Sequence, residues 1–310
     1  MTQIYQIIDA FKVAMQDAGI PAPDHIITDG KLHRAHIAGH KPSSQNLAYF
    51  LHIDGKPNGG YEDFKSGIKG KWKLDGETQQ ISQADRQQYE AAKQESHKQQ
   101  AQRYEQAAIV AQRLVSIAKP LTGNNHLYLQ RKRVESFGLY RLRNWHKRVK
   151  DETGQWVSLD IKNVLLVPLI DLNNQLWNVQ AIFTEPDPML GRDKDFLSGG
   201  RLGGLFHVIG LATDEVIICE GYSTGASLHE ATNLQILCAM SAGNLLPVAQ
   251  AVRAVDPRKK IIIAADNDAK TPGNPGLTAA KKAALAVGGF LAVPPAPGDF
   301  NDMANTEVQS

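Results

Sequence analysis

The chain has 310 residues, of which 42% are hydrophobic and 21% are charged, and its formal net charge is +2. This length supports two or three domains with cores of their own, and the residue balance is ordinary for a globular protein. The small net charge excludes a uniformly basic nucleic-acid-binding surface, so any basic surface has to be local.

Two cysteines, Cys219 and Cys238, are too few for a zinc site built from cysteine pairs, and they favour a reducing compartment. The sequence contains no apolar run as long as a membrane span. Its first residues also lack the basic-then-apolar pattern of a signal peptide. We therefore expect a cytoplasmic protein with no membrane partner.

Residues 1–78 are predicted to form a small N-terminal α+β unit. Apolar residues recur at helical spacing within 4–19, and Gly19 ends that pattern. Strands are expected over 32–39 and 47–54. The turn signals that separate these short segments are Asp29-Gly30, Asp54-Gly55 and Asn58-Gly59-Gly60.

Residues 79–120 are predicted to be a helical linker. The stretch 80–118 is rich in Gln, Ala, Glu and Lys and has neither Gly nor Pro. Such a composition indicates a long, largely solvated helix with at most one break, ending before Pro120. A coiled coil is the competing interpretation, but the first half of the stretch has no sustained apolar seam.

A basic segment with interleaved aromatic residues begins the next predicted subdomain, residues 121–212. One interpretation is a solvated face whose cations pair with acids elsewhere. The other is a surface that neutralises nucleic-acid phosphates while its aromatic residues stack on bases. Lys132, Arg141 and Arg143 are the candidate nucleic-acid contacts. The segment contains Arg131, Lys132, Arg133, Phe137, Tyr140, Arg141, Arg143, Trp145, Lys147, Arg148 and Lys150, with Glu135 as its acid.

The remainder of that subdomain is predicted to be rich in β-structure. The apolar runs 164–171 and 176–183 flank Asn173-Asn174, which indicates a hairpin. Residues 213–310 then alternate strand-like and helix-like patterns. This alternation predicts a doubly wound parallel sheet, so the chain is of mixed α/β and α+β class.

Acidic residues follow two of the predicted strands in this last region. Glu220 ends the run 215–221, and Asp266 and Asp268 end the run 260–268. A third cluster, with Asp299 and Asp302, lies close to the end of the chain. Ligands collect at the carboxyl ends of strands in open α/β sheets, and converging carboxylates there favour a divalent cation and phosphate chemistry.

These motifs resemble a known family. The Glu-Gly after one strand and the Asp-x-Asp after a later strand are similar to the Toprim domain. EGYSTGASLHEAT (220–232), SAGNL (241–245), ADNDAKTPGNPG (265–276) and DFNDM (299–303) resemble the DNA primases of phages and conjugative plasmids. These are the TraC-like and primase–helicase types. The preceding block, which ends in KDFLSGG, resembles the first half of the DnaG-type catalytic core.

The resemblance implies a DNA primase that makes short RNA primers on single-stranded DNA from NTPs, for phage or plasmid replication. By this likeness Glu220, Asp266 and Asp268 are catalytic and, with Asp299 and Asp302, hold Mg²⁺ or Mn²⁺. Lys194, Arg192 and Arg201 would bind the nucleotide.

The sequence also departs from the family pattern. It has no zinc module and no Walker A motif, so we expect no zinc and no helicase motor. A separate replicative helicase is then one expected partner, and template recognition falls to residues 1–78 or to a partner.

Two alternatives remain open at this point. The same acidic residues can direct water instead of a 3′-hydroxyl, which would make the protein a metal-dependent nuclease. A non-catalytic module that binds single-stranded DNA in replication is the other alternative, and it predicts no dependence on Glu220.

Overall fold

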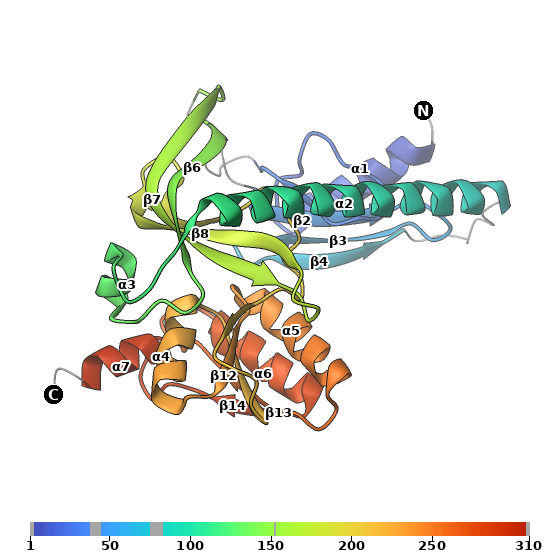
Figure 1. Ribbon diagram of the computed structural model, residues 1–310. Coiled ribbons are helices and arrows are strands. Elements are labelled where there is room, and N and C mark those ends of the chain that lie inside the picture. Colours follow the sequence, from blue (N-terminus) through green and yellow to red (C-terminus); the bar gives the residue numbers. More distant parts are fainter. Residues whose placement is uncertain (1–2, 38–44, 75–82, 152, 308–310) are drawn as a thin grey trace. The chain divides into compact units, whose positions relative to one another are not determined.

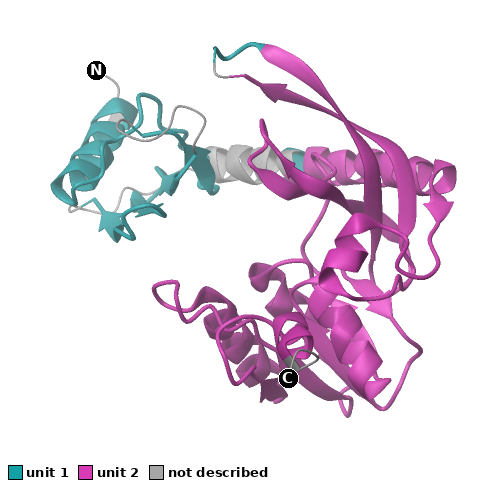
Figure 2. Ribbon diagram, turned by 90° about the vertical axis from the view of Figure 1, so that its left-hand side faces the viewer, with its two compact units in different colours: residues 1–96, 152–155 teal, residues 97–151, 156–310 magenta. Residues whose placement is uncertain are grey.

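The computed structural model describes residues 3–37, 45–74, 83–151 and 153–307 (Figure 1). The chain divides into two compact units. Unit 1 comprises residues 1–96 with 152–155, and unit 2 comprises residues 97–151 with 156–310 (Figure 2).

Unit 1 is a helix packed on a four-stranded antiparallel sheet. The helix is α1 (Gln3–Asp17), and the strands, in sheet order, are β1 (His33–Ala35), β2 (Leu47–His52), β3 (Asn58–Asp63) and β4 (Lys69–Lys73). Apolar residues of α1, including Phe11 and Met15, pack on alternate residues of β2, namely Leu47, Tyr49 and Leu51. The predicted helix is confirmed. The predicted strand 32–39 is shorter, and its last two residues lie outside the described part of the chain.

The Asn58-Gly59-Gly60 segment is part of β3, so its prediction as a turn is wrong. The two glycines instead permit close approach of aromatic rings from opposite faces of the sheet. A Cβ on Gly59 would lie 2.6 Å from the Phe11 ring, and one on Gly60 would lie 2.6 Å from the Phe50 ring. The chain reverses before β3, at Gly55, whose φ is +64°.

The long helix α2 (Gln83–Ile117) runs without a break from unit 1 into unit 2. Its 35 residues include neither Gly nor Pro, which explains its continuity. None of the helices in the described part of the chain combines the length and apolar character needed to cross a membrane.

Unit 2 begins with a second antiparallel sheet. Its strands, in chain and sheet order, are β5 (Lys119–Pro120), β6 (Tyr140–Lys150), β7 (Trp156–Ile170), β8 (Leu176–Asp187) and β9 (Arg192–Phe196). The short helix α3 (Leu127–Lys132) precedes β6. The hairpin predicted around Asn173-Asn174 joins β7 to β8, with Asn174 at φ +60°. The basic segment forms the end of α3 and all of β6.

The C-terminal sheet has the order β10-β12-β11-β13-β14. Its strands are β10 (His207–Ile209), β11 (Glu215–Cys219), β12 (Gln235–Cys238), β13 (Lys260–Ala264) and β14 (Phe290–Ala292). Four strands are parallel, as predicted, but the edge strand β10 is antiparallel to β12. Parallel strands need a crossover of a dozen or more residues. Only residues 210–214 separate β10 from β11, so the chain reverses there.

Helices cover both faces of this sheet, which makes it doubly wound. They are α4 (Tyr222–Thr232), α5 (Ala242–Val255), α6 (Pro275–Val287) and α7 (Phe300–Glu307). Val216 and Ile218 of β11 share a core with α5 and α6. The alternate residues, Ile217 and Cys219, share the other core with α4 and with Phe300 of α7. Each of these four β11 side chains therefore contributes to one of two apolar layers.

Two buried polar side chains join the C-terminal sheet to the region around α3. The Tyr222 hydroxyl donates to the Glu135 carbonyl at 2.8 Å and accepts from the Phe137 N–H at 2.7 Å. Asn301 of α7 donates to the Lys132 carbonyl at 2.7 Å. These bonds fix the position of the C-terminal sheet relative to α3, because breaking them would leave buried polar groups unsatisfied.

Helix α4 packs closely on this sheet at Gly225, where an added Cβ would lie 2.3 Å from the Cys238 sulfur. We expect Gly225→Ala to reduce the free energy of unfolding by about 1–3 kcal/mol, measured by urea denaturation. Gly243→Ala is the matched control, because no atom lies within 4 Å of its added Cβ. Equal stability of both variants and the unmodified protein would contradict this packing.

Candidate active site

The carboxyl ends of β11 and β13 bring the first three acidic residues together. The two strands are parallel neighbours, with Ile218 opposite Ile263. Glu220 directly follows β11, while Asp266 and Asp268 lie in the loop after β13. Parallel neighbours end at the same edge of a sheet, so the three side chains lie at one edge, as the sequence predicted.

Glu220 lies at the N-terminus of α5, where its carboxylate accepts a hydrogen bond from the Ala242 N–H. This contact favours the charged form, because helix N-termini carry unpaired N–H groups and partial positive charge. Burial nevertheless raises the pKa of Glu220, and the negative charges of Asp268 and Asp299 raise it further. Glu220 is thus an anchored carboxylate in an electrostatically unfavourable position.

Asp266 is the most perturbed member of the cluster. Burial, followed by the negative charges of Glu220, Asp299 and Asp268, raises its pKa to about 7. Its Oδ1 is buried and has no hydrogen-bond partner. A buried carboxylate oxygen without a donor is costly unless it is protonated or binds a cation.

Asp268 is held by the loop that leads into α6. Its Oδ2 accepts from the Gly276 N–H at 3.1 Å, and its own N–H donates to Asn274 Oδ1 at 2.9 Å. A Cβ on Gly276 would lie 2.8 Å from the Asp266 carbonyl oxygen and 2.9 Å from Asp268 Oδ2. Glycine at 276 therefore permits the close approach of α6 to both aspartates.

Asn267, between the two aspartates, ties this loop to the third acidic cluster. Its backbone N–H and carbonyl exchange hydrogen bonds with Gly298, at 2.9 and 3.0 Å. Its side chain donates to the Pro294 and Ala296 carbonyls, each at 3.3 Å. This bridge places Asp299, the residue after Gly298, close enough for its charge to raise the pKa of Asp266.

Asp299 and Asp302 cap α7 reciprocally. Asp299 Oδ1 accepts from the N–H groups of Asn301 and Asp302, at 2.7 and 2.9 Å. Asp302 Oδ2 accepts from the Asp299 N–H at 3.2 Å, and its Oδ1 lies 3.7 Å from Lys132 Nζ. Both side chains therefore have structural partners, and a metal-binding role for them stays a prediction.

Lys194 on β9 is the basic residue that the structure associates with the acidic cluster. Its positive charge lowers the pKa values of Glu220 and Asp266, although burial outweighs this effect. It also lies 5.9 Å from the centre of the Tyr128 ring. Residues 192 and 194–200, with Leu202, line a groove of about 370 Å³. Lys194 thus lines this groove and also acts electrostatically on the carboxylates, as a residue that binds a polyphosphate would.

The other two predicted nucleotide contacts are engaged within the protein. Arg192 pairs with the buried Asp195 at 2.7 Å, and Lys147 also pairs with that carboxylate. Arg201 lies 5.2 Å from the centre of the Trp177 ring and donates to the Gly203 carbonyl at 3.1 Å. A role of Arg192 or Arg201 toward a nucleotide stays a prediction.

The three predicted nucleic-acid contacts lie on α3 and β6. Lys132 is the last residue of α3 and faces Asp302. Arg141 is exposed and donates to Asn163 Oδ1 at 2.6 Å, and Arg143 is exposed two residues further along β6. The arginines therefore lie on one exposed stretch of strand.

The donor set fits a hard divalent cation. Mg²⁺ in proteins commonly binds one or two carboxylates and fills its other positions with water and substrate phosphates. Within the described residues, no three Asp, Glu, His or Cys side chains form a complete metal-binding group. Glu220 and Asp266 fit the requirement for two carboxylates, because their charges repel each other and one Asp266 oxygen has no hydrogen-bond partner.

Comparison with known proteins defines the class of this region. Residues 215–309 match the family model described as the Toprim domain, so this part of the chain is a Toprim domain. Toprim domains generally bind Mg²⁺. The Toprim match and the three sheets together confirm the predicted mixed α/β and α+β fold class.

The chain as a whole is TraC-like, which confirms the predicted resemblance. It is 32% identical to the DNA primase TraC of Escherichia coli over 94% of its own length and 27% of that protein. A second Escherichia coli DNA primase TraC is 31% identical over 92% of this chain and 19% of the relative. The chain thus spans well under half the length of the curated relatives that it matches.

Two solved structures show looser similarity. The DnaG primase catalytic domain bound to ssDNA has a TM-score of 0.46 at 14% identity, over 67% of this chain and 76% of that chain. The primase fragment of the bacteriophage T7 primase–helicase has a TM-score of 0.37 at 15% identity, over 59% and 66%.

Sequence reasoning missed three asparagines that organise the site: Asn267, Asn274 and Asn301. Asn274 caps α6 and also donates to Asn267 Oδ1 at 3.0 Å. An Asn directly before Pro275 is a usual helix start, and this signal was available in the sequence. The buried Asn301 joins Ser227 of α4 at 3.0 Å, a contact that no local pattern indicates.

The raised pKa of Asp266 predicts how stability depends on pH. A carboxyl group whose folded pKa is about 7, against an ordinary 3.8, stabilises the fold when protonated, and this contribution is lost as pH rises toward 7. In metal-free buffer at pH 8, we expect Asp266→Asn to raise Tm by roughly 2–6 °C. At pH 5, which lies between the unfolded and the folded pKa of this group, we expect a smaller increase.

Glu215→Gln is the control for this experiment. Glu215 begins β11, at the opposite end from Glu220, and its carboxylate is partly exposed and paired with Lys260 at 2.6 Å. We expect a small change that is similar at both pH values. A lower Tm for Asp266→Asn at pH 8 would show that Asp266 is not a strained anion.

Proposed function

We propose that this protein is a DNA primase that makes short RNA primers on single-stranded DNA by metal-dependent nucleotidyl transfer. The observation that carries this proposal is the pair Glu220 and Asp266, with an unpartnered carboxylate oxygen, beside Lys194. Similarity to TraC over nearly the whole chain supports the reaction and suggests a plasmid setting, with phage replication as the other expected setting.

In this proposal Glu220 and Asp266 hold Mg²⁺ or Mn²⁺, with Asp268, Asp299 and Asp302 as further candidate ligands. When bound, the metal would polarise the phosphate oxygens and lower the pKa of the primer 3′-hydroxyl. Asp268 and Asp299 keep the local potential negative, which favours a bound cation at the pair.

Lys194 is proposed to bind the triphosphate of the incoming NTP and to offset charge that builds on the transferred phosphoryl group. The groove beside it, lined by residues 194–200, gives room for the nucleotide. Arg192 lines this groove, and Arg201 lies between two of its lining residues in the sequence. Both would assist Lys194 in binding the triphosphate. In this proposal the triphosphate of the NTP lies between Lys194 and the metal-binding carboxylates.

Lys132, Arg141 and Arg143 are proposed to contact the phosphates of the single-stranded template. Arg141 and Arg143 are exposed, as phosphate-binding side chains must be. A separate replicative helicase would supply the unwound strand.

Primer synthesis by the purified protein tests this proposal. The protein is incubated with single-stranded DNA, labelled NTPs and Mg²⁺, and the products are resolved on a denaturing gel. We expect Glu220→Gln and Asp266→Asn each to reduce primer yield by roughly 100-fold or more, because each removes a charge from the metal-binding pair. Glu215→Gln, at the far end of the same strand, should retain full yield.

The same reactions separate the alternatives. Primer synthesis that survives both substitutions would contradict the proposal. Degradation of single-stranded DNA without NTPs, lost in Glu220→Gln, would identify a nuclease instead. DNA binding without any product, unaffected by Glu220→Gln, would identify a non-catalytic replication module.

A further inference from the structure

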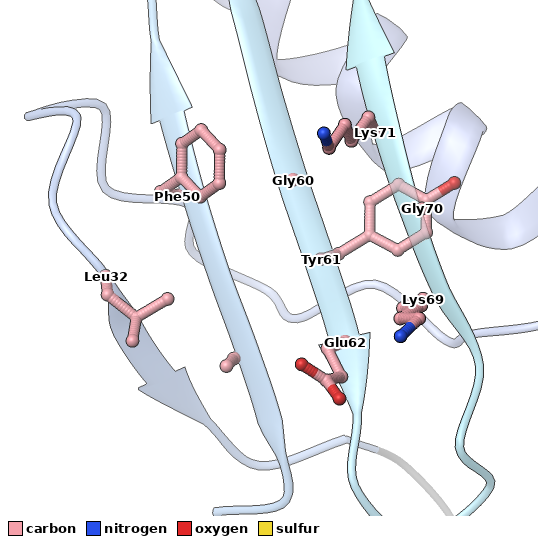
Figure 3. Close-up of a pocket in the computed structure, with 9 residues that line it drawn as sticks. Leu32, Phe50, Gly60, Tyr61, Glu62, Lys69, Gly70 and Lys71 are labelled. Carbon is pink, nitrogen blue, oxygen red and sulfur yellow. The ribbon is translucent and has the colours of Figure 1, made fainter. Parts of the chain in front are cut away.

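The sheet of unit 1 has a second face, opposite the one on which α1 packs. Paired residues in antiparallel strands project to the same side, so two cross-strand rows define this face. One row is Phe50, Gly60 and Lys71, and the other is Ala48, Glu62 and Lys69. Residues of both rows line a groove of about 420 Å³ (Figure 3).

The floor of this groove is apolar. Phe50 lies over Gly60, where an added Cβ would be 2.6 Å from the ring. Because glycine has no side chain, the ring can pack directly on β3. Leu32, which is 69% exposed and directly precedes β1, also lines the groove (Figure 3). An aromatic ring on an open sheet face presents a flat surface to a ligand of similar shape.

One side of the groove is cationic. Lys69, Lys71 and Lys73 alternate along β4, so all three project to this face, and all are exposed. Arg34 of β1, opposite Ala48, adds a fourth cation at the other edge. Glu62 is the acid in the two rows, and it lies opposite Lys69.

We propose that this face binds single-stranded DNA, with an unpaired base on Phe50 and the neighbouring phosphates along the β4 lysines. Neighbouring strands are about 5 Å apart, so the backbones that carry Phe50 and Lys71 are separated by about two strand spacings, and the ring leans over Gly60 between them. This separation suits a nucleotide, whose base and phosphate are set apart by the sugar.

The chemistry of the face selects this ligand over others. An apolar protein segment on Phe50 would remove the lysines from water without neutralising them. Duplex DNA keeps its bases stacked inside, where a ring on a flat sheet does not reach them. An unpaired strand supplies both a π-face and regular negative charge. The inference deepens the proposed function by assigning template capture to unit 1, and it rests on that function for the identity of the strand.

Fluorescence anisotropy with the full chain and a labelled 12-nucleotide oligo-dT tests this inference. Phe50→Leu keeps an apolar side chain over Gly60 but removes the aromatic face, and we expect its Kd to rise roughly fivefold or more. Lys71→Ala should weaken binding and make it less dependent on salt concentration, because one phosphate contact is lost. Lys56→Ala, an exposed lysine in the turn between β2 and β3, is the matched control and should bind as the unmodified protein does.

A second measurement locates the contact. We expect an oligonucleotide carrying 5-iodo-deoxyuridine to crosslink to the peptide that contains residues 47–52, and the crosslink should disappear in Phe50→Leu. Unchanged oligonucleotide affinity in both Phe50→Leu and Lys71→Ala would overturn the proposal. So would unchanged affinity accompanied by loss of self-association in Phe50→Leu, which would make the face a contact between copies of the chain.

Asp266→Asn distinguishes failure of this inference from failure of the proposed function. We expect it to bind the oligonucleotide normally while making no primer. If Asp266→Asn makes no primer, as expected, but Phe50→Leu binds DNA with unchanged affinity, only the proposed DNA-binding face is overturned. Weaker DNA binding by Phe50→Leu in a protein whose unmodified form makes no primer would overturn the polymerase proposal alone.

Discussion

The organisation of this protein depends on the cost of placing several carboxylates together at the edge of one sheet. The strands β11 and β13 are parallel neighbours, so the acidic residues that follow them lie at the same edge of the sheet. Asp266 bears most of the cost, because it is largely buried, repelled by its neighbours and left with an unpartnered oxygen. Lys194 alone does not remove this strain, and the cation that we propose for this site would relieve it.

The surrounding structure holds this unfavourable cluster in place. Helix N-termini donate to Glu220 and Asp268, and the Asn267–Gly298 bridge brings the start of α7 alongside. Asn301 and Tyr222 then attach the C-terminal sheet to the region around α3. Hydrogen bonds thus hold the acidic residues in place, and Asp266 Oδ1 is the oxygen of the cluster that is buried without a partner.

Much of this arrangement could be predicted from the sequence, since short apolar runs and glycines mark the strands and turns of the C-terminal sheet. The acidic residues could be placed at one edge because parallel strands share a direction. Other features depend on contacts between distant residues. Asn58-Gly59-Gly60 matches a turn signal, yet rings from Phe11 and Phe50 require those glycines within a strand. The antiparallel direction of β10 likewise follows from tertiary structure. The capping of α7 by Asp299 and Asp302 is local by contrast, because its hydrogen bonds join residues two or three positions apart.

The proposed function implies that Mg²⁺ takes the place of a proton on the Glu220–Asp266 pair. Isothermal titration calorimetry with Mg²⁺, in buffers of different ionisation enthalpy, measures this exchange directly. We predict that binding at pH 6.5 releases protons, that the release falls as pH rises well above 7, and that Asp266→Asn removes it. Mg²⁺ binding at pH 6.5 without proton release, or with the same release in Asp266→Asn, would contradict the account.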